Sequence, residues 1–235
     1  MLQIGFLLVC SWALLWFFER SPLTVLGFMP TKKTWWLLLV LFFTAVLTSS
    51  STFLFRMHYL GERFQLNEQL SCPNLLLESW FQVRTVLTEE LLCRGVLLYL
   101  LVKRMGETKA VVLTSILFAL LHWFNAGTWG HLVQMSLVFL FTFFMGLVLG
   151  FAFVKTQSLL APFFIHFGWN YMQNFVFPES NTGRHLLAIA TPAAEVTVSY
   201  LTFFILFFLP KISLIGSTFL IIKRYSQKQA ATNLL

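Results

Sequence analysis

Residues 131–154 read HLVQMSLVFLFTFFMGLVLGFAFV and contain no acidic or basic residue other than His131. A helix needs roughly 20 apolar residues to cross the ~30 Å hydrocarbon core of a bilayer, so this stretch is long enough to span a membrane. It belongs to a chain of 235 residues that is 58% apolar and only 11% charged. Because a soluble domain carries about 25% charged residues, the sequence predicts an integral membrane protein.

Six further apolar stretches flank this one. They cover residues 1–18, 35–55, 76–102, 109–124, 158–177 and 195–222. The last contains Pro210 and Lys211, and an internal proline breaks or kinks a helix, so it is expected to form one kinked span or two partial ones. We therefore predict an all-α fold, a polytopic transmembrane helical bundle with seven spans, or eight if the last stretch divides.

Basic residues are distributed unevenly between the two sides of this bundle. Three lie in the loops of one side, Arg56, Arg63 and Arg184. Ten lie on the other side, namely Arg20, Lys32, Lys33, Lys103, Arg104, Lys109, Lys155, Lys223, Arg224 and Lys228. Because cytoplasmic loops carry the excess of Lys and Arg, we predict a multi-pass protein of the plasma or inner membrane with a cytoplasmic C-terminus and an external N-terminus. The basic residues form no continuous stripe, so no nucleic-acid partner is expected.

The spans are expected to form one membrane unit, because the two longest loops, 56–74 and 178–194, are too short to hold a core of their own. Three segments are distinguished within it. Residues 1–75 supply the N-terminal transmembrane helices and a loop, residues 76–177 a helical core with most of the intramembrane polar groups, and residues 178–235 a loop, the C-terminal transmembrane helix and a short basic tail.

The acidic residues are few and unevenly placed. The chain has nine glutamates and no aspartate, which excludes a Ser-His-Asp triad and an aspartyl dyad. Only Glu89 and Glu90 lie deep inside an apolar stretch. A charge at the bilayer centre costs at least ~2.5–3.5 kcal/mol on insertion scales, so such residues usually face a partner or a functional cavity. On a helix Glu90 and Arg94 share a face and form a supporting ion pair, which leaves Glu89 free for another role.

Two more spans carry polar residues at helical spacing. His122 ends the run FALLH over 118–122, and His166 and Asn170 are four residues apart on one helix face. At 1.5 Å per residue from the cytoplasmic end of each span, these three residues and Glu89 lie roughly 12–20 Å deep. The four side chains are therefore expected to meet in one layer.

Such a layer contains the groups that amide hydrolysis needs. Glu89 and His122 can activate a water molecule, and His166 and Asn170 offer two donors to the oxyanion. Glu89, His122 and His166 can alternatively ligate a divalent metal such as zinc, since three protein ligands and a water form the usual catalytic zinc site. The chain has no HExxH motif, so metal-free catalysis is placed slightly ahead and no cofactor is firmly expected.

The polar groups resemble, in order, the motifs of the type II CAAX prenyl protease and bacteriocin-processing family, also called the CPBP or abortive-infection family. The matching runs are EExxxR (Glu89, Glu90, Arg94), FxxxH (Phe118, His122) and HxxxN (His166, Asn170). The resemblance covers about residues 80–177. It implies an all-helical intramembrane endopeptidase with these residues in the roles just described, and the family is often labelled as metalloproteases.

The resemblance also suggests substrates. Eukaryotic members remove the last three residues of prenylated CAAX proteins, and many bacterial members are linked to peptide processing or bacteriocin self-immunity. We therefore expect CAAX-type C-terminal processing or bacteriocin processing of a peptide or membrane-protein substrate in the lipid bilayer. The alternative is a non-catalytic peptide-binding or bacteriocin self-immunity protein that uses the same cavity. An ion or proton transporter is a weaker alternative, because the sequence shows no repeat symmetry.

Overall fold

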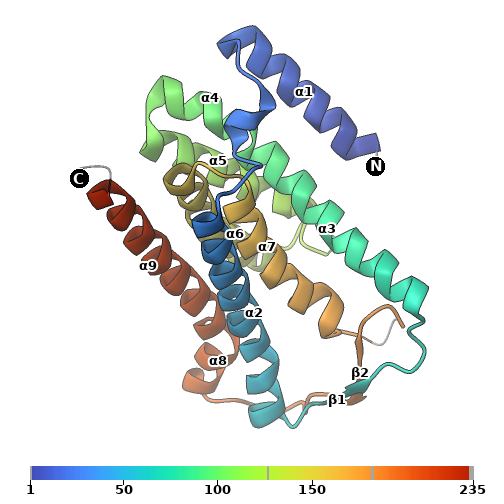
Figure 1. The fold of residues 1–235 in the computed structure, drawn as a ribbon. Helices are drawn as coiled ribbons and strands as arrows, with labels where there is room; N and C mark the ends of the chain where they lie inside the picture. The colour runs from blue at the N-terminus through green and yellow to red at the C-terminus, as the bar shows by residue number, and fades with distance from the viewer. Residues whose placement is uncertain (1, 126, 181–182, 233–235) are drawn as a thin grey trace.

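The computed structural model describes residues 2–125, 127–180 and 183–232, which form a bundle of helices with two short strands at one end (Figure 1). The helices are α1 (Leu2–Glu19), α2 (Lys32–Leu60), α3 (Cys72–Arg94), α4 (Val96–Met105), α5 (Glu107–Leu121), α6 (Leu132–Thr156), α7 (Leu160–Tyr171), α8 (Tyr200–Phe207) and α9 (Leu209–Thr232). Single turns of other helix types, η1 (Leu23–Leu26), η2 (His122–Phe124) and η3 (Met172–Val176), adjoin them. The prediction of a helical membrane fold is confirmed.

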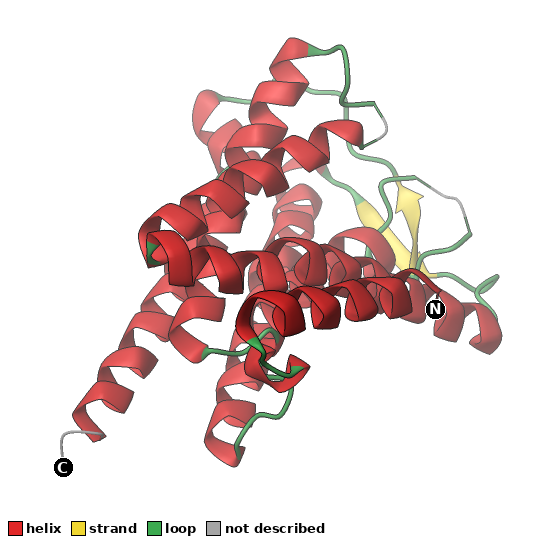
Figure 2. Ribbon diagram, turned by 90° about the horizontal axis from the view of Figure 1, so that it is seen from above, coloured by secondary structure: helices red, strands yellow, loops and turns green. Residues whose placement is uncertain are grey.

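The bundle also contains two short strands that the sequence analysis did not predict. Strands β1 (Arg63–Leu66) and β2 (Leu187–Thr191) lie in the two longest loops and pair antiparallel, with Leu66 opposite Leu187. They lie at the end of the bundle opposite the last turns of α9, and at its edge when the bundle is viewed from above (Figures 1 and 2). The sequence did not reveal them because each strand is short and its partner is far away in the chain, so no hairpin signal exists.

Fewer helices than the predicted seven are long and apolar enough to span a membrane. Within the described part of the chain, four helical segments are long and apolar enough to cross a membrane, namely α1, α2, α5 with η2, and α6. The bent pair α8 and α9 makes a fifth if it is counted as one span. Seven spans are therefore not confirmed, and the orientation of the bundle stays a prediction from the charge distribution.

The two predicted spans that fail this criterion are those that carry most of the polar motifs. The stretch 76–102 divides at Gly95 into α3 and α4, and α3 contains five charged residues. Helix α7 has 12 residues, which is about 18 Å of helix and too short to cross the hydrocarbon core. Helix α7 packs against α2, α3 and α6, whereas α3 lies along the edge of the bundle, where Leu76 and Leu77 are exposed (Figure 1).

The core and the lipid-facing surface are separated within the bundle. Leu38 of α2, Leu149 of α6 and Ile165 of α7 are fully buried in one apolar cluster that also includes residues of α9. Helix α1 lies on the outside, and its Trp12 and Trp16 are exposed (Figure 1). An apolar, exposed outer surface of this kind is expected for a protein in lipid.

Glycines allow the helices that hold the polar motifs to approach closely. Gly146 and Gly150 on α6 face α5, where a Cβ added at Gly146 would lie 2.9 Å from Cβ of Ser115. Gly168 on α7 faces α2, where an added Cβ would lie 2.8 Å from the backbone oxygen of Phe42. Small residues at such interfaces let helix backbones pack tightly in a membrane. These contacts fix α5 against α6 and α7 against α2.

Candidate active site

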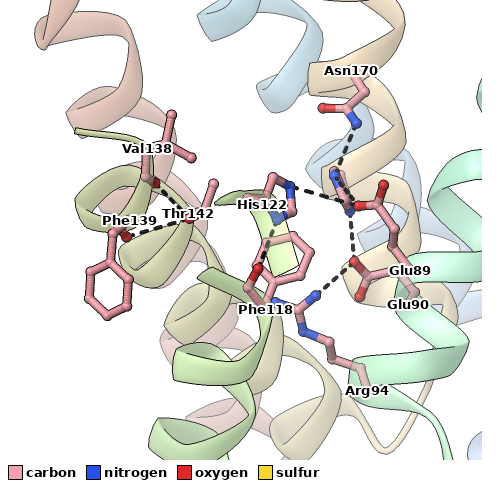
Figure 3. A network of polar contacts seen from close by, with 10 residues as sticks. Glu89, Glu90, Arg94, Phe118, His122, Val138, Phe139, Thr142 and Asn170 are labelled. Carbon is pink, nitrogen blue, oxygen red and sulfur yellow. Dashed lines mark hydrogen bonds and ion pairs between the residues drawn. The ribbon is translucent and has the colours of Figure 1, made fainter. Parts of the chain in front are cut away.

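Four polar side chains from three parts of the bundle line one cleft (Figure 3). Glu89 comes from the end of α3, His122 from the 3-10 turn after α5, and His166 and Asn170 from successive turns of α7. The cleft has a volume of about 590 Å³. This volume lies within the roughly 300–1,000 Å³ of small-ligand pockets. The structure therefore brings together the four residues that the sequence analysis selected.

The carboxylate of Glu89 lies between two imidazole rings. Its Oε2 is 4.0 Å from Nε2 of His122 and 3.7 Å from Nε2 of His166. Both distances exceed a direct hydrogen bond, and they suit polar groups that interact through a shared water molecule. The side chain of Glu89 is 32% exposed and contributes to the cleft wall, although its Oε2 is itself buried and has no hydrogen-bond partner among the described residues.

The orientation of His122 is set within its own helical turn. Its Nδ1 lies 2.8 Å from the backbone oxygen of Phe118, one turn earlier. A carbonyl oxygen only accepts hydrogen bonds, so the network assigns the proton to Nδ1. Nε2 of the neutral ring then directs a lone pair towards Glu89. The Phe118 ring also contacts the His122 ring, with centroids 4.3 Å apart.

Glu90, adjacent to Glu89 but on a different face of α3, holds His166 from behind. The Glu90 side chain is fully buried, and its Oε1 accepts hydrogen bonds from Nδ1 of His166 at 2.7 Å and from Nη1 of Arg94 at 3.1 Å. On the other side of the imidazole ring, Nε2 of His166 lies 3.1 Å from Nδ2 of Asn170. Since Nδ1 donates to the carboxylate, Nε2 of the neutral ring accepts from Asn170. The second N–H of the Asn170 amide remains available to another acceptor.

Phe118 connects these groups through its ring faces. The guanidinium carbon of the fully buried Arg94 lies 3.9 Å from the Phe118 ring centroid, and the His166 ring packs edge-on against Phe118 at 5.7 Å. The predicted ion pair between Glu90 and Arg94 is present. The sequence did not indicate that Glu90 also bonds His166, because this contact joins residues 76 positions apart.

The three residues suggested as zinc ligands, Glu89, His122 and His166, do not form a metal centre in this arrangement. Across the described ranges of the chain, no group of three His, Cys or Glu side chains is placed to hold a metal ion. Nε2 of His166, the atom expected to coordinate zinc, accepts a hydrogen bond from Asn170. Zinc binding through Nε2 of His166 would require Asn170 to release this nitrogen. A zinc site at these three residues stays a prediction.

A helical membrane bundle with a glutamate, two histidines and an asparagine converging on one cleft defines a candidate intramembrane hydrolase. The model of the Type II CAAX prenyl endopeptidase Rce1-like family matches residues 73–172. This match confirms the predicted family resemblance over residues 73–172. The matched segment contains all the residues of the three motifs. No curated protein and no solved structure matches the chain.

Proposed function

We propose that this protein is an intramembrane endopeptidase that uses Glu89 to activate the attacking water. The observation that carries the proposal is the position of Glu89 Oε2 between Nε2 of His122 and Nε2 of His166, at the wall of the cleft. A carboxylate in the wall of a cleft that faces two imidazoles and has no cationic partner of its own is suited to general base catalysis. The substrate is a peptide or membrane protein that reaches this cleft within the bilayer.

In the first step, a water molecule donates one hydrogen bond to Oε2 of Glu89 and the other to Nε2 of His122. This arrangement leaves a lone pair of the water oxygen directed at the carbonyl carbon of the substrate. Glu89 takes the proton as the new C–O bond forms. His122 orients the water, since its Nδ1–H is held by the backbone oxygen of Phe118.

In the same step the carbonyl oxygen of the substrate becomes an oxyanion. Asn170 donates its second N–H to it. His166 donates from Nε2 once the ring is an imidazolium and Asn170 has released this atom. Glu90 holds that ring in place by accepting a hydrogen bond from its Nδ1 at 2.7 Å. When the intermediate collapses, the C–N bond breaks and the leaving amine takes the proton from Glu89. Each oxyanion donor contributes about 10²–10³ in kcat in well-studied hydrolases.

The test replaces the base and leaves the rest of the site in place. Glu89→Gln is expected to lower kcat for a membrane-delivered peptide by about 10²–10⁴, because a general base is lost. The matched control is Glu78→Gln, which removes a carboxylate from the same helix but outside the residues lining the cleft. This control should retain activity, and His122→Ala should behave like Glu89→Gln.

Two outcomes would contradict the proposal. If Glu89→Gln and His122→Ala are both inserted and folded and still turn over substrate normally, Glu89 is not the general base. Binding of peptides by the wild-type protein without any cleavage would instead favour the non-catalytic alternative. Mass spectrometry of membrane peptides from cells with the wild-type gene and with a Glu89→Ala allele would identify the substrates.

A further inference from the structure

Lys211 lies in the wall of the same cleft, on the first turn of α9. Helix α9 begins after a bend of 47° from α8. Nζ of Lys211 donates a hydrogen bond to the backbone oxygen of Phe207 at 2.8 Å. It also lies 4.3 Å from the ring centroid of Phe207 and 4.9 Å from that of Phe141. The ammonium group is thus held at the cleft wall by one carbonyl and two aromatic faces.

This cation has no carboxylate partner among the described residues, whereas other lysines of the bundle do. Lys103 pairs with Glu19, and Lys155 pairs with Glu107. Ring faces attract an ammonium group but do not neutralise its charge, and an ammonium has three donors, of which the Phe207 carbonyl takes one. An uncompensated charge inside a membrane bundle is costly, and such residues mark sites of function.

The walls around Lys211 restrict what it can bind. Apolar side chains of α6 and α9, including Val138, Met145 and Leu214, line one part of the cleft, and polar side chains that include Gln134, Gln173 and Glu179 line another part. One cavity therefore combines the Glu89 site, an apolar patch and a lysine that forms no ion pair with Glu179 or any other carboxylate of the described residues. A short apolar peptide segment that ends in a negative charge is complementary to all three.

We propose that Lys211 binds the free C-terminal carboxylate of the substrate, an assignment that rests on the proposed endopeptidase function. A charge-assisted N–H···O bond between the ammonium and the terminal carboxylate fixes the end of the chain, while the last side chains contact the apolar patch. Since an extended peptide advances at most ~3.3–3.6 Å per residue, anchoring its end fixes which peptide bond reaches Glu89. Lys211 is thus a specificity-determining residue, and it lies outside the matched segment 73–172.

The experiment compares two peptides that differ only at their C-terminus. A membrane-delivered substrate peptide is prepared with a free carboxylate and with a carboxamide, and kcat/KM is measured for both with the full-length protein in liposomes. We expect the wild type to prefer the acid by roughly 10- to 100-fold, the range of one hydrogen bond between charged groups. Lys211→Met should bring the ratio close to one, mainly by slowing cleavage of the acid, and Lys211→Arg should keep much of the preference.

The matched control is Lys223→Met, which removes an exposed lysine from the same helix outside the cleft lining and should leave the ratio unchanged. If Lys211 only caps the last turn of α8, Lys211→Met will slow both peptides equally, and that result overturns the proposal. Equal cleavage of acid and amide by the wild type overturns it without any Lys211 variant, as expected if the lysine instead binds a lipid phosphate.

A binding measurement separates this proposal from the proposed function. In the Glu89→Gln background, the Kd of the two fluorescent peptides is measured with Lys211 intact and with Lys211→Met. Tighter binding of the acid that disappears in Lys211→Met supports carboxylate recognition even if the wild type proves unable to cleave. Equal binding of acid and amide contradicts carboxylate recognition even if the wild type is a protease.

Discussion

The buried contact between Glu90 and Arg94 allows a quantitative prediction. Both side chains are fully buried, and Oε1 of Glu90 accepts hydrogen bonds from Arg94 and His166 at 3.1 and 2.7 Å. Glu90→Gln removes the negative charge and leaves the Arg94 guanidinium uncompensated over the Phe118 ring. Removing one partner of a buried ion pair costs about 3–5 kcal/mol, so we expect a loss of that size in the free energy of unfolding.

The same geometry predicts that the two positions are strongly coupled. Arg94→Met alone leaves the buried Glu90 carboxylate without its cationic partner, so it should also lower the free energy of unfolding by about 3–5 kcal/mol. The double variant Glu90→Gln/Arg94→Met has no buried charge at either position, so it should be far more stable than the sum of the single losses implies. SDS-induced unfolding from mixed micelles measures all four proteins, with Glu78→Gln as a control expected within about 0.5 kcal/mol of wild type. Additive losses would refute the ion pair as the unit of stabilisation.

Three further predictions follow from other parts of the molecule. Gly168→Ala places a Cβ 2.8 Å from the Phe42 backbone oxygen, so thermal unfolding should show a loss of about 1–3 kcal/mol, whereas Gly216→Ala has no atom within 4 Å and should be stabilising by about 0.5–1 kcal/mol. Burial raises the pKa of Glu62 above its ordinary value of 4.5 despite the ion pair with Arg56. The folded state therefore binds this proton more tightly than the unfolded state. Stability should fall as the pH rises from below 4.5 through the raised pKa, and Glu62→Gln should remove that step in a pH series of melting curves. A strong chelator should leave proteolysis unchanged if catalysis is metal-free, whereas an activity lost on chelation and restored only by zinc would establish the metal-dependent mechanism.

Much of the fold could be predicted from the sequence, because apolar stretches long enough for helices stand out from their polar flanks. Each predicted stretch overlaps at least one helix of the structure. The span count could not be obtained in the same way, since hydropathy does not show that a helix breaks at Gly95 or that α7 ends after 12 residues. The strand pair was also hidden, because its stability depends on two loops meeting in space.

For the candidate site, helical spacing and depth were sufficient to select residues but not to assign their contacts. The spacing of Glu90 and Arg94 within one helix predicted their ion pair, which the structure contains. The hydrogen bond from His166 to Glu90 joins two helices, so no local pattern could reveal it. Lys211 was visible only as a charge beside a proline, and its place in the cleft wall depends on the packing of α9. Contacts between helices are therefore what the structure adds.

The adjacent glutamates illustrate how one helix can keep stability and chemistry separate. Consecutive residues point about 100° apart around a helix, so Glu90 faces Arg94 and the interior while Glu89 faces the cleft. Glu90 and Arg94 balance each other's charge and leave no net charge in the packed interior. Glu89 instead lies in the cleft wall between two imidazoles, where the proposed mechanism needs a base. Glu89 and Glu90 could not exchange roles, because a carboxylate paired with Arg94 is not available as a free base.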